Sequence, residues 1–336
     1  MTASFLAWAK FGVCAALIGL AGPALIRYGE VISQRTGVSR TWIGLVLLAT
    51  ATSLPELFTG ISAVTIADAP NIAVGAALGS CVFNLAMLVV LDALSRDEPV
   101  YRYIDQGHIL TAGFGVILIG SAGALVLLGG NGTGLKFMHI GVYTPFIVVL
   151  YLIAMRAAFV YDRRTKQAPP SAKDASTITL TTALIRYAAA TAVVAGAGSW
   201  LPFIGQDIAD TMGWQTTFVG TLLIAGATSL PELVVTISAL RLGAVDMAIG
   251  NLLGSNLFDV LILAVDDIFY TKGPLLASVS PAHAVTAFGA VIMSGIFIVA
   301  LLYRPETRFR GTIGWVSLSL LVVYLLSSYA VYLHGH

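Results

Sequence analysis

Charge is scarce in this sequence. Of its 336 residues, 10% are Asp, Glu, Lys or Arg, whereas 57% are hydrophobic and 34 residues are glycine. A soluble domain carries about 25% charged residues, so this chain has too little charge to cover a surface that faces water. The net charge of +1 also gives no reason to expect nucleic acid or an acidic partner. The composition therefore predicts a polytopic membrane protein, with lipid as its solvent.

Thiol and imidazole groups are scarce too. The two cysteines, Cys14 and Cys81, lie in apolar runs, which excludes a disulfide framework and a thiolate metal cluster. The five histidines are scattered and have no metal-ligand spacing. No ATP-binding element is present, so any transport is expected to be secondary, without a resident cofactor and without an enzymatic reaction.

Ten segments are apolar over the roughly 20 residues that a membrane-spanning helix requires. They are residues 3–27, 41–66, 71–94, 107–128, 138–160, 178–204, 214–240, 245–269, 279–303 and 311–333. One long hydrophilic stretch, residues 161–177, separates the first five segments from the last five. We therefore expect an all-α polytopic membrane protein of two five-helix halves, residues 1–160 and 178–336, joined by a cytoplasmic linker at residues 161–177.

The distribution of positive charge predicts the orientation. Fifteen of the 18 Lys and Arg residues fall on one side of this topology, and only Lys10, Lys136 and Lys272 fall on the other. Positive residues accumulate on the cytoplasmic side of membrane proteins. We therefore expect a multi-pass protein of the cell membrane with both termini outside the cytoplasm. The first segment is expected to be an uncleaved helix, because its positive residues follow the apolar run rather than precede it.

The two halves contain an internal repeat. The heptapeptide ATSLPEL occurs at Ala51–Leu57 and again, without change, at Ala227–Leu233. Further along, GSCVFN at Gly79–Asn84 aligns with GSNLFD at Gly254–Asp259. Because each half has an odd number of helices, the second copy must cross the membrane in the opposite sense. Inverted-topology repeats are typical of transporters, whose binding site lies near the bilayer midplane.

Acidic and amide side chains lie near the middle of the repeated spans. They are Glu56 and Glu232 in the first motif, and Asn84 and Asp259 in the second. Three carboxylates left unpaired would cost roughly 8–10 kcal/mol, at about 2.5–3.5 kcal/mol each. No Lys or Arg is available at that depth, so a cation, a proton or both must compensate them. The alternative is a set of protonated carboxyls that hydrogen-bond between helices.

The residues around these acids offer oxygen atoms. Pro55 and Pro231 cannot donate to the carbonyls of Ala51 and Ala227, so helices 2 and 7 should break there and expose backbone oxygens. Hydroxyls come from Thr52, Ser53, Ser80, Thr228, Ser229 and Ser255. Such an all-oxygen shell favours Na⁺ or Ca²⁺ over zinc or copper. Helix packing is the alternative role for any one of these hydroxyls.

Two elements of the form [G/A]-T-S-x-P-E, each followed by G-S-x-x-x-[N/D], make the sequence resemble the cation/calcium exchanger superfamily. Within it, the likeness to the prokaryotic sodium/calcium exchangers is the greatest. The resemblance implies two inverted five-helix halves and an antiporter in which Glu56 and Glu232 are shared between a central Ca²⁺ site and flanking Na⁺ sites. The other implied ligands are Thr52, Thr228, Ser53, Ser80, Ser229, Ser255, Asn84, Asp259 and the carbonyls of Ala49 and Ala225.

The sequence departs from the superfamily pattern at a few positions. Ala51 and Ala227 stand where glycine usually precedes the threonine, and Cys81 stands where the second repeat has asparagine. None of these changes removes an implied side-chain ligand. Two further aligned acids, Asp92 and Asp267, lie near helix ends, and we expect solvated or capping interactions for them.

Several alternatives remain open at this stage. Protons could replace Na⁺ in a calcium/proton exchanger, K⁺ could be a further coupled ion, and a cation channel would belong to another class of protein. The resemblance also implies that residues 3–37 and 178–212 move as a gating pair of helices. We expect a monomer in the bilayer, with the ions as its partners.

Overall fold

The structure is a computed structural model, and most of the chain in it is helical. It describes residues 2–95, 99–102, 104–129, 136–165, 178–212, 225–305, 308–309 and 313–334. Part of the predicted linker, residues 166–177, lies outside the described residues. The same is true of residues 214–224, which open the predicted span 214–240.

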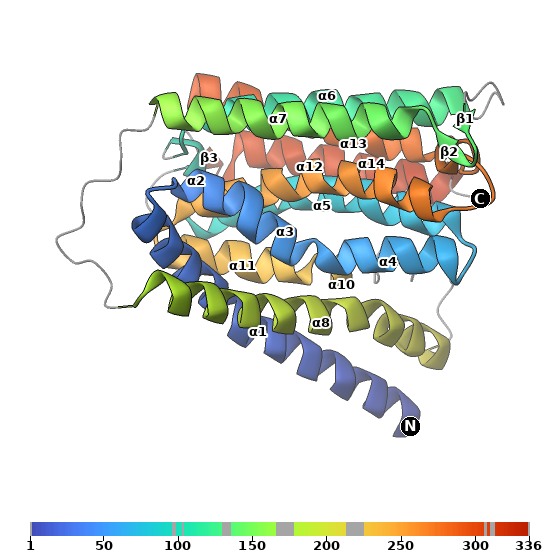
Figure 1. Ribbon diagram of the computed structural model, residues 1–336, viewed down its shortest axis with the longest axis horizontal. Coiled ribbons are helices and arrows are strands. Elements are labelled where there is room, and N and C mark those ends of the chain that lie inside the picture. Colours follow the sequence, from blue (N-terminus) through green and yellow to red (C-terminus); the bar gives the residue numbers. More distant parts are fainter. Residues whose placement is uncertain are drawn as a thin grey trace. The chain divides into compact units, whose positions relative to one another are not determined.

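The elements follow the predicted spans closely, with two short hairpins added. They are α1 (Thr2–Thr36), α2 (Arg40–Trp42), the π-helical turn η1 (Ile43–Leu48), α3 (Ala49–Thr52), α4 (Leu54–Thr65), α5 (Pro70–Leu94), η2 (Val100–Arg102), α6 (Gly107–Gly129), β1 (Lys136–Phe137), β2 (Ile140–Gly141), α7 (Tyr143–Thr165), α8 (Leu180–Met212), α10 (Ala225–Thr228), α11 (Leu230–Arg241), α12 (Val245–Phe269), η4 (Leu275–Ala277), α13 (His283–Tyr303), β3 (Arg308–Phe309), β4 (Ile313–Gly314) and α14 (Trp315–His334). Figure 1 labels most of them.

Seven of the described helices are long and apolar enough to cross a membrane. The number is eight when the bent pair Arg40–Thr52 and Leu54–Thr65 counts as one span. The apolar part of α14, Trp315–Val331, is shorter. The structure therefore shows an all-helical protein with many membrane spans, whereas the predicted count of ten is not reached within the described residues.

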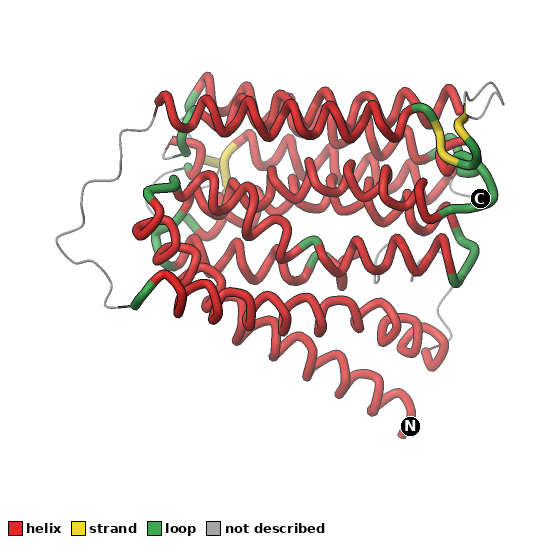
Figure 2. Tube along the Cα trace, viewed as in Figure 1, coloured by secondary structure: helices red, strands yellow, loops and turns green. Residues whose placement is uncertain are grey.

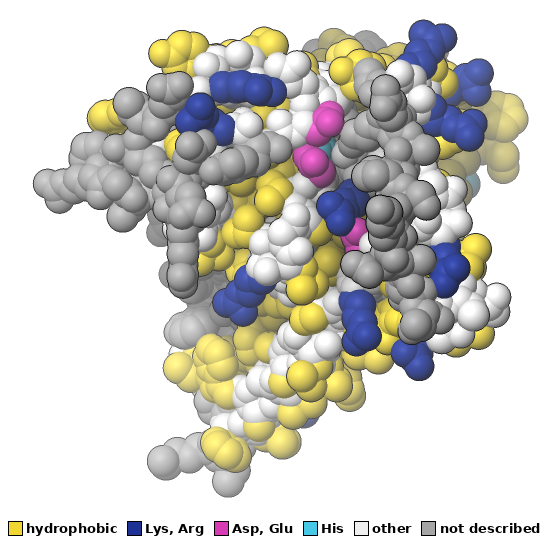
Figure 3. Space-filling model, turned by 90° about the vertical axis from the view of Figure 1, so that its left-hand side faces the viewer, with side chains coloured by type: hydrophobic (Ala, Val, Ile, Leu, Met, Phe, Trp, Pro, Cys, Tyr) yellow, Lys and Arg dark blue, Asp and Glu magenta, His cyan; other side chains and the backbone are white. Residues whose placement is uncertain are grey.

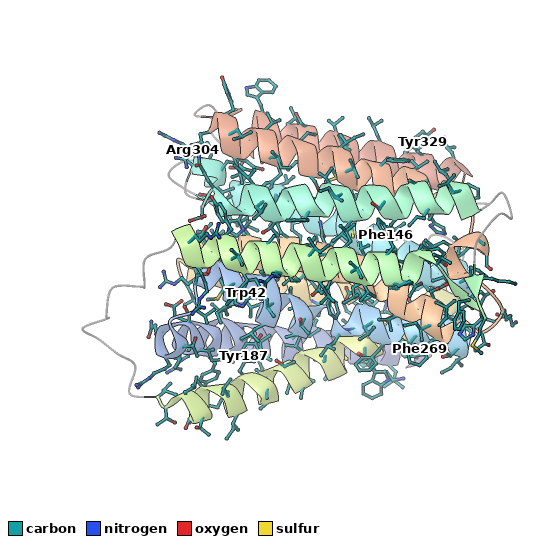
Figure 4. The ribbon with its side chains drawn as sticks, turned by 45° about the horizontal axis from the view of Figure 1, so that its top comes forward. Trp42, Phe146, Tyr187, Phe269, Arg304 and Tyr329 are labelled. Carbon is teal, nitrogen blue, oxygen red and sulfur yellow. The ribbon has the colours of Figure 1, made fainter. Side chains whose placement is uncertain are left out.

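Large apolar side chains are exposed on the outer helices. Phe146 of α7 is 50% exposed and Tyr329 of α14 is 60% exposed, and both are labelled in Figure 4. Leu152 of α7 is 58% exposed. Water would disfavour so much apolar surface, whereas lipid tails accept it. The exposed side chains thus agree with the prediction that lipid surrounds the chain.

The chain forms two compact units, and each unit combines parts of both sequence halves. Unit 1 contains Met1–Glu56 and Phe159–Ser255, and unit 2 contains Leu57–Ala158 and Asn256–His336. The helices α4, α7 and α12 continue from one unit into the other. These two units are not the two predicted repeats. The predicted boundary between the repeats, residues 161–177, stays a prediction.

In unit 1, the two longest helices pack against each other. Figure 1 shows α8 running beside α1, and α10 packs against α8. Their shared core contains Ile18 of α1, Leu201 and Ile208 of α8, and Ala227 of α10. Gly37, with φ of 70°, ends α1, since glycine adopts this left-handed backbone without strain.

One end of unit 1 collects positive charge. Arg35 donates to the Ile178 carbonyl at 3.2 Å, and Arg186 donates to the Tyr28 hydroxyl at 3.2 Å. These contacts bring the end of α1 and the start of α8 together. On the face drawn in Figure 3, Lys and Arg side chains are more frequent than acidic ones. The sequence predicts that the end of unit 1 with Arg35 and Arg186 lies on the cytoplasmic side of the membrane, and this orientation stays a prediction.

In unit 2, two buried aspartates hold the β-hairpins. Asp267, near the end of α12, accepts hydrogen bonds from the Gly141 amide at 2.8 Å, the Tyr143 hydroxyl at 2.6 Å and the Leu275 amide at 2.7 Å. A fourth donor is the Thr144 hydroxyl. The β1–β2 hairpin, yellow in Figure 2, ends at the first of these donors.

Asp92, near the end of α5, has the same role at the β3–β4 hairpin. It accepts from the amides of Val100 at 3.2 Å and Gly314 at 2.8 Å, and from the Ser317 hydroxyl at 2.7 Å. Ser317 also bonds Tyr101, and burial raises the pKa of the Tyr101 hydroxyl. Each half of the sequence thus supplies the aspartate that holds the hairpin of the other half.

The expectation of solvated acids was therefore wrong for these two positions. Asp92 and Asp267 are both 0% exposed. The expectation of capping interactions is confirmed, because backbone amides of the following loops donate to both carboxylates. The sequence did not reveal this arrangement, because each aspartate and the hairpin that it binds lie in opposite halves of the chain.

The Asp267→Asn variant should destabilise the protein. An amide nitrogen would face donors where a carboxylate now accepts four hydrogen bonds, and losing charge-assisted bonds costs about 3 kcal/mol. We expect the melting temperature in detergent to fall by at least about 5 °C. Asp68→Asn is the control, because Asp68 pairs with Lys272 while both side chains are more than half exposed. Equal shifts in the two variants would contradict the assignment.

Candidate ion-binding site

Unit 1 contains two helix breaks that have the same backbone conformation. Ser53 lies between α3 and α4 with φ −89° and ψ 6°, and Ser229 lies between α10 and α11 with φ −86° and ψ 6°. The first break bends its helix by 41°, and it is the green interruption between the two helices in Figure 2. The predicted breaks near Pro55 and Pro231 are therefore present, and the repeated sequence produces a repeated conformation.

The motif explains each break. Proline fits the first turn of a helix, where its missing N–H removes no intrahelical bond. Pro55 and Pro231 accordingly each stand at the second residue of a new helix. The glutamate that follows lies in the first turn, where the positive end of the helix dipole stabilises a carboxylate. The sequence Ser-Leu-Pro-Glu thus places a carboxylate at a helix start deep inside the protein.

Glu56 and Glu232 are linked to the opposite breaks. The Ser53 hydroxyl donates to Glu232 Oε1 at 3.2 Å, and the Ser229 hydroxyl donates to Glu56 Oε1 at 3.4 Å. The two glutamates are 3% and 1% exposed, and both serines are 0% exposed. Each serine therefore donates a hydrogen bond to the glutamate of the other repeat.

Glu232 is only partly satisfied by these contacts. Its carboxylate faces the hydroxyls of Thr52, Ser53 and Ser255. Its second oxygen, Oε2, has no hydrogen-bond partner among the described residues. The Ser255 hydroxyl oxygen is likewise buried and makes no hydrogen bond there. Such a set of oxygens suits a hard cation better than a neutral core.

Asn251 of α12 is a site residue that the sequence reasoning missed. The Thr52 hydroxyl donates to Asn251 Oδ1 at 3.2 Å, and Asn251 Nδ2 donates to the Thr236 hydroxyl at 3.4 Å. Asn251 is 0% exposed. It stands four residues before Ser255 and so lies on the same helix face, which is the signal that could have identified it. Asn251 thus contacts the Thr52 hydroxyl, which also lies 3.1 Å from the Leu48 carbonyl oxygen.

Glycines bring α12 close to the first break. A Cβ at Gly250 would lie 2.7 Å from the Thr41 carbonyl oxygen, and one at Gly254 would lie 2.7 Å from the Ala49 Cβ. The two glycines are four residues apart and form one smooth face, as in close helix pairs of membrane proteins. This close approach sets the distance between α12 and the turn that carries Ala49.

Another glycine brings α8 against both breaks. A Cβ at Gly198 would lie 2.5 Å from Pro55 Cγ and 3.3 Å from Pro231 Cγ. Gly22 holds the aligned position in α1, and a Cβ there would lie 2.8 Å from a methyl of Val234. The predicted gating pair, α1 and α8, therefore packs directly on the helices that carry the glutamates.

Unit 2 contains a second polar cluster. Asn84 Nδ2 donates to Asp259 Oδ2 at 3.4 Å, and the Cys81 thiol contacts the same oxygen at 3.8 Å. All three side chains are at most 1% exposed. Asn84 Oδ1 and Asn256 Oδ1 are buried and have no hydrogen-bond partner among the described residues. Cys81, a departure from the superfamily pattern, thus lies beside a predicted ligand.

The predicted ligands divide between the two units. Unit 1 contains Ala49, Thr52, Ser53, Glu56, Ala225, Thr228, Ser229, Glu232 and Ser255, and unit 2 contains Ser80, Asn84 and Asp259. Every one of these polar side chains is at most 3% exposed. The Ala49 carbonyl accepts a hydrogen bond from the Ser53 amide at 3.0 Å, and the Thr52 hydroxyl also approaches it at 3.4 Å. Their assignment as ligands stays a prediction.

The donor set is one of hard oxygens. In the part of the chain that the structure describes, no three His, Cys, Asp or Glu side chains converge as they would around zinc. Carboxylates, hydroxyls, amides and carbonyls are the ligands that Ca²⁺ and similar cations take. The ion pairs Lys10–Asp207, Arg40–Glu30 and Lys272–Asp68 involve acids outside both clusters.

Apolar helices that break around buried carboxylates are typical of membrane transporters for cations. The family model described as sodium/calcium exchanger protein matches residues 6–160 and 182–333. The chain therefore belongs to the sodium/calcium exchanger family, whose members are secondary transporters and not enzymes. The family resemblance stated from the motifs is confirmed, and so are the two repeats.

Similar proteins agree with this assignment. The sodium/calcium exchanger MaX1 of Methanosarcina acetivorans is 28% identical over 323 residues, which cover 83% of this chain and 85% of that protein. The inner membrane protein YrbG of Escherichia coli is 24% identical and covers 93% of this chain and 94% of its own. A solved structure of the sodium-calcium exchanger NCX_Mj has a TM-score of 0.74 at 22% identity and covers 97% of this chain and 99% of that chain. At this low sequence identity, the similarity to NCX_Mj shows a shared fold alone.

The Gly198→Val variant should weaken the packing of α8 on the two prolines. The new side chain would collide with Pro55, and overpacking of this kind costs about 1–3 kcal/mol. Gly196→Val is the matched control, because nothing lies within 4 Å of a Cβ at Gly196 on the same helix. We expect a lower melting temperature in detergent for Gly198→Val alone. Equal melting temperatures for the two variants would show that this contact does not constrain α8.

Proposed function

We propose that this chain is a secondary antiporter that exchanges Na⁺ for Ca²⁺ by alternating access. The observation that supports it most is the reciprocal hydrogen bonding of Glu56 and Glu232 to the serines of the opposite breaks. The proposed ion ligands are Ala49, Thr52, Ser53, Glu56, Ser80, Asn84, Ala225, Thr228, Ser229, Glu232, Ser255 and Asp259. Na⁺ and Ca²⁺ are the substrates of this protein and not resident cofactors.

The electrostatics of unit 1 supports exchange rather than leak. Glu56 and Glu232 are 3% and 1% exposed, and two like charges repel strongly where the dielectric constant is low. An unloaded site would therefore resist the transition in which water access changes sides. One Ca²⁺ or several Na⁺ would cancel the repulsion and permit it. Because both ions need the same carboxylates, they compete, and competition at one site is the basis of antiport.

The repeat supports alternating access. The two motifs share their sequence and their backbone angles at the breaks. We propose ten membrane spans in two halves of inverted topology, with both termini outside the cytoplasm. An inverted pair can form two related conformations, open to opposite sides, by exchanging the roles of its halves. The helices α1 and α8 are the proposed moving elements, because they cover both breaks.

The counter-ion is the part of the proposal with alternatives. The hydroxyls of Thr52, Ser53 and Ser255 around Glu232 favour Na⁺, which needs several neutral oxygen ligands, over a proton, which needs one. Potassium could accompany Na⁺ without any change to the carboxylates. A channel is disfavoured because the family consists of secondary transporters. The similar proteins MaX1 and NCX_Mj are both sodium/calcium exchangers, which also favours Na⁺.

Glu232→Gln should abolish Na⁺-driven ⁴⁵Ca²⁺ uptake into proteoliposomes. The change keeps the shape of the side chain and removes the charge that Ca²⁺ would need, so we expect a loss of at least about a hundredfold, equivalent to about 3 kcal/mol. Glu30→Gln is the matched control, because Glu30 forms an ion pair with Arg40 outside both clusters. Full transport by a folded Glu232→Gln protein would refute the proposed site.

The counter-ion can be identified with wild-type protein. Gradients of Na⁺, K⁺ and H⁺ are imposed one at a time across proteoliposomes, and ⁴⁵Ca²⁺ uptake is measured. We expect uptake with the Na⁺ gradient alone, and no uptake when only K⁺ or H⁺ is out of equilibrium. Uptake driven by a pH gradient without Na⁺ would identify a calcium/proton exchanger. Passive uptake of ⁴⁵Ca²⁺ without a gradient of Na⁺, K⁺ or H⁺ would identify a channel.

A further inference from the structure

Asp266 of α12 is a buried carboxylate outside the proposed ligand set. Its side chain is 0% exposed, and neither of its oxygens has a hydrogen-bond partner among the described residues. The adjacent Asp267 accepts four hydrogen bonds, so the two neighbours differ completely. A carboxylate in this state requires a partner that is not part of the described chain.

The position of Asp266 places it between a proposed ligand and the surface. It follows Asp259 by seven residues on one continuous helix, which is two turns and about 10 Å along the same face. The helix ends three residues later at Phe269, which is 46% exposed and labelled in Figure 4. An ion that moves between Asp259 and this end of α12 would pass the Asp266 carboxylate.

The facing helix leaves room for the carboxylate. A Cβ at Gly60 of α4 would collide with both oxygens of Asp266, so the carboxylate lies directly on the α4 backbone. Gly60 is one turn after Glu56 in α4. The residue before it, Thr59, also has a buried hydroxyl oxygen without a hydrogen-bond partner among the described residues. Two neighbouring side chains of unit 2 thus have buried oxygen atoms without a hydrogen-bond partner in the described part of the chain.

This arrangement occurs in one repeat only. Asp267 aligns with Asp92, so the position of Asp266 aligns with Leu91, and the position of Gly60 aligns with Thr236. The shared repeat thus does not require an acid here. A carboxylate that serves one repeat can act on ions at one side of the membrane, whereas the shared ligands act on both.

We propose that Asp266 is an additional cation-binding position for Na⁺ or Ca²⁺ on the route between Asp259 and the side of the membrane at which α12 ends. The inference rests on the proposed function, since it assumes that cations reach Asp259. The carboxylate holds a partly hydrated cation before it enters the main site and raises the local cation concentration. Its loss should therefore slow ion capture from that one side.

The test measures ⁴⁵Ca²⁺ transport from each side separately, in vesicles of both orientations. Asp266→Asn should raise the KM for Ca²⁺ about tenfold at the side where α12 ends. A tenfold change is the lower end of the range by which a charge raises the local concentration of an oppositely charged ion. The KM at the opposite side should change less than twofold, and the melting temperature should not fall. The one-sided effect should shrink as ionic strength rises, because salt screens a capturing charge. A merely structural role would give neither the sidedness nor the salt dependence.

A second variant tests the same position from the other helix. Gly60→Ala should produce the same one-sided rise in KM, because the added methyl displaces the carboxylate. It should add nothing in the Asp266→Asn background, since contacting residues of one site are not additive. Gly113→Ala is the control, because nothing lies within 4 Å of a Cβ at this glycine of α6.

The outcomes separate this inference from the proposed function. An unchanged KM at both sides for Asp266→Asn, or an equal rise at both sides, overturns the inference. The proposed function itself fails if Glu232→Gln still transports Ca²⁺, whatever Asp266 does. A loss of transport in Glu232→Gln together with unchanged kinetics in Asp266→Asn would refute the inference alone.

Discussion

The burial of negative charge is the constraint on which this structure depends. In unit 1, Glu56 and Glu232 lie in the first turns of helices that begin inside the protein, so two helix dipoles point at them. Each also accepts a hydrogen bond from the serine at the opposite break. These contacts reduce the cost of burying the carboxylates but do not use all of their oxygens, since Glu232 Oε2 has no partner in the described chain. Cations are the natural complement of such a site.

The buried acids of the protein divide into two groups by how completely they are bonded. Asp92 and Asp267 accept hydrogen bonds from loops, from hairpins and from the first turns of α14 and α7, and they hold the ends of unit 2 in place. Glu232 and Asp266 keep oxygens that have no hydrogen-bond partner among the residues that the structure describes. A fully bonded carboxylate gains nothing from an ion, whereas a partly bonded one in low dielectric does. Hydrogen bonding therefore distinguishes structural acids from the candidates for ion binding better than burial does.

Small residues make the arrangement possible and explain how it could move. Gly250 and Gly254 let α12 approach the first break, and Gly198 lets α8 rest on both prolines. Contacts of this kind are close but smooth, so they hold helices near each other without locking side chains together. Membership of the sodium/calcium exchanger family agrees with such a design, in which two long helices cover the breaks that carry the carboxylates.

The sequence by itself determined the membrane class, most of the helix positions, the repeat and the two breaks. These features follow from composition and from local chemistry, because the proline of each repeated motif favours the start of a new helix and apolar runs of sufficient length span a bilayer. Only the tertiary structure decided which groups meet. It paired Ser53 with Glu232, brought Asn251 to Thr52, and replaced the expected solvation of Asp92 and Asp267 with buried hydrogen bonds. These partners lie far apart along the chain, and local patterns carry no information about which distant helix faces will be packed together.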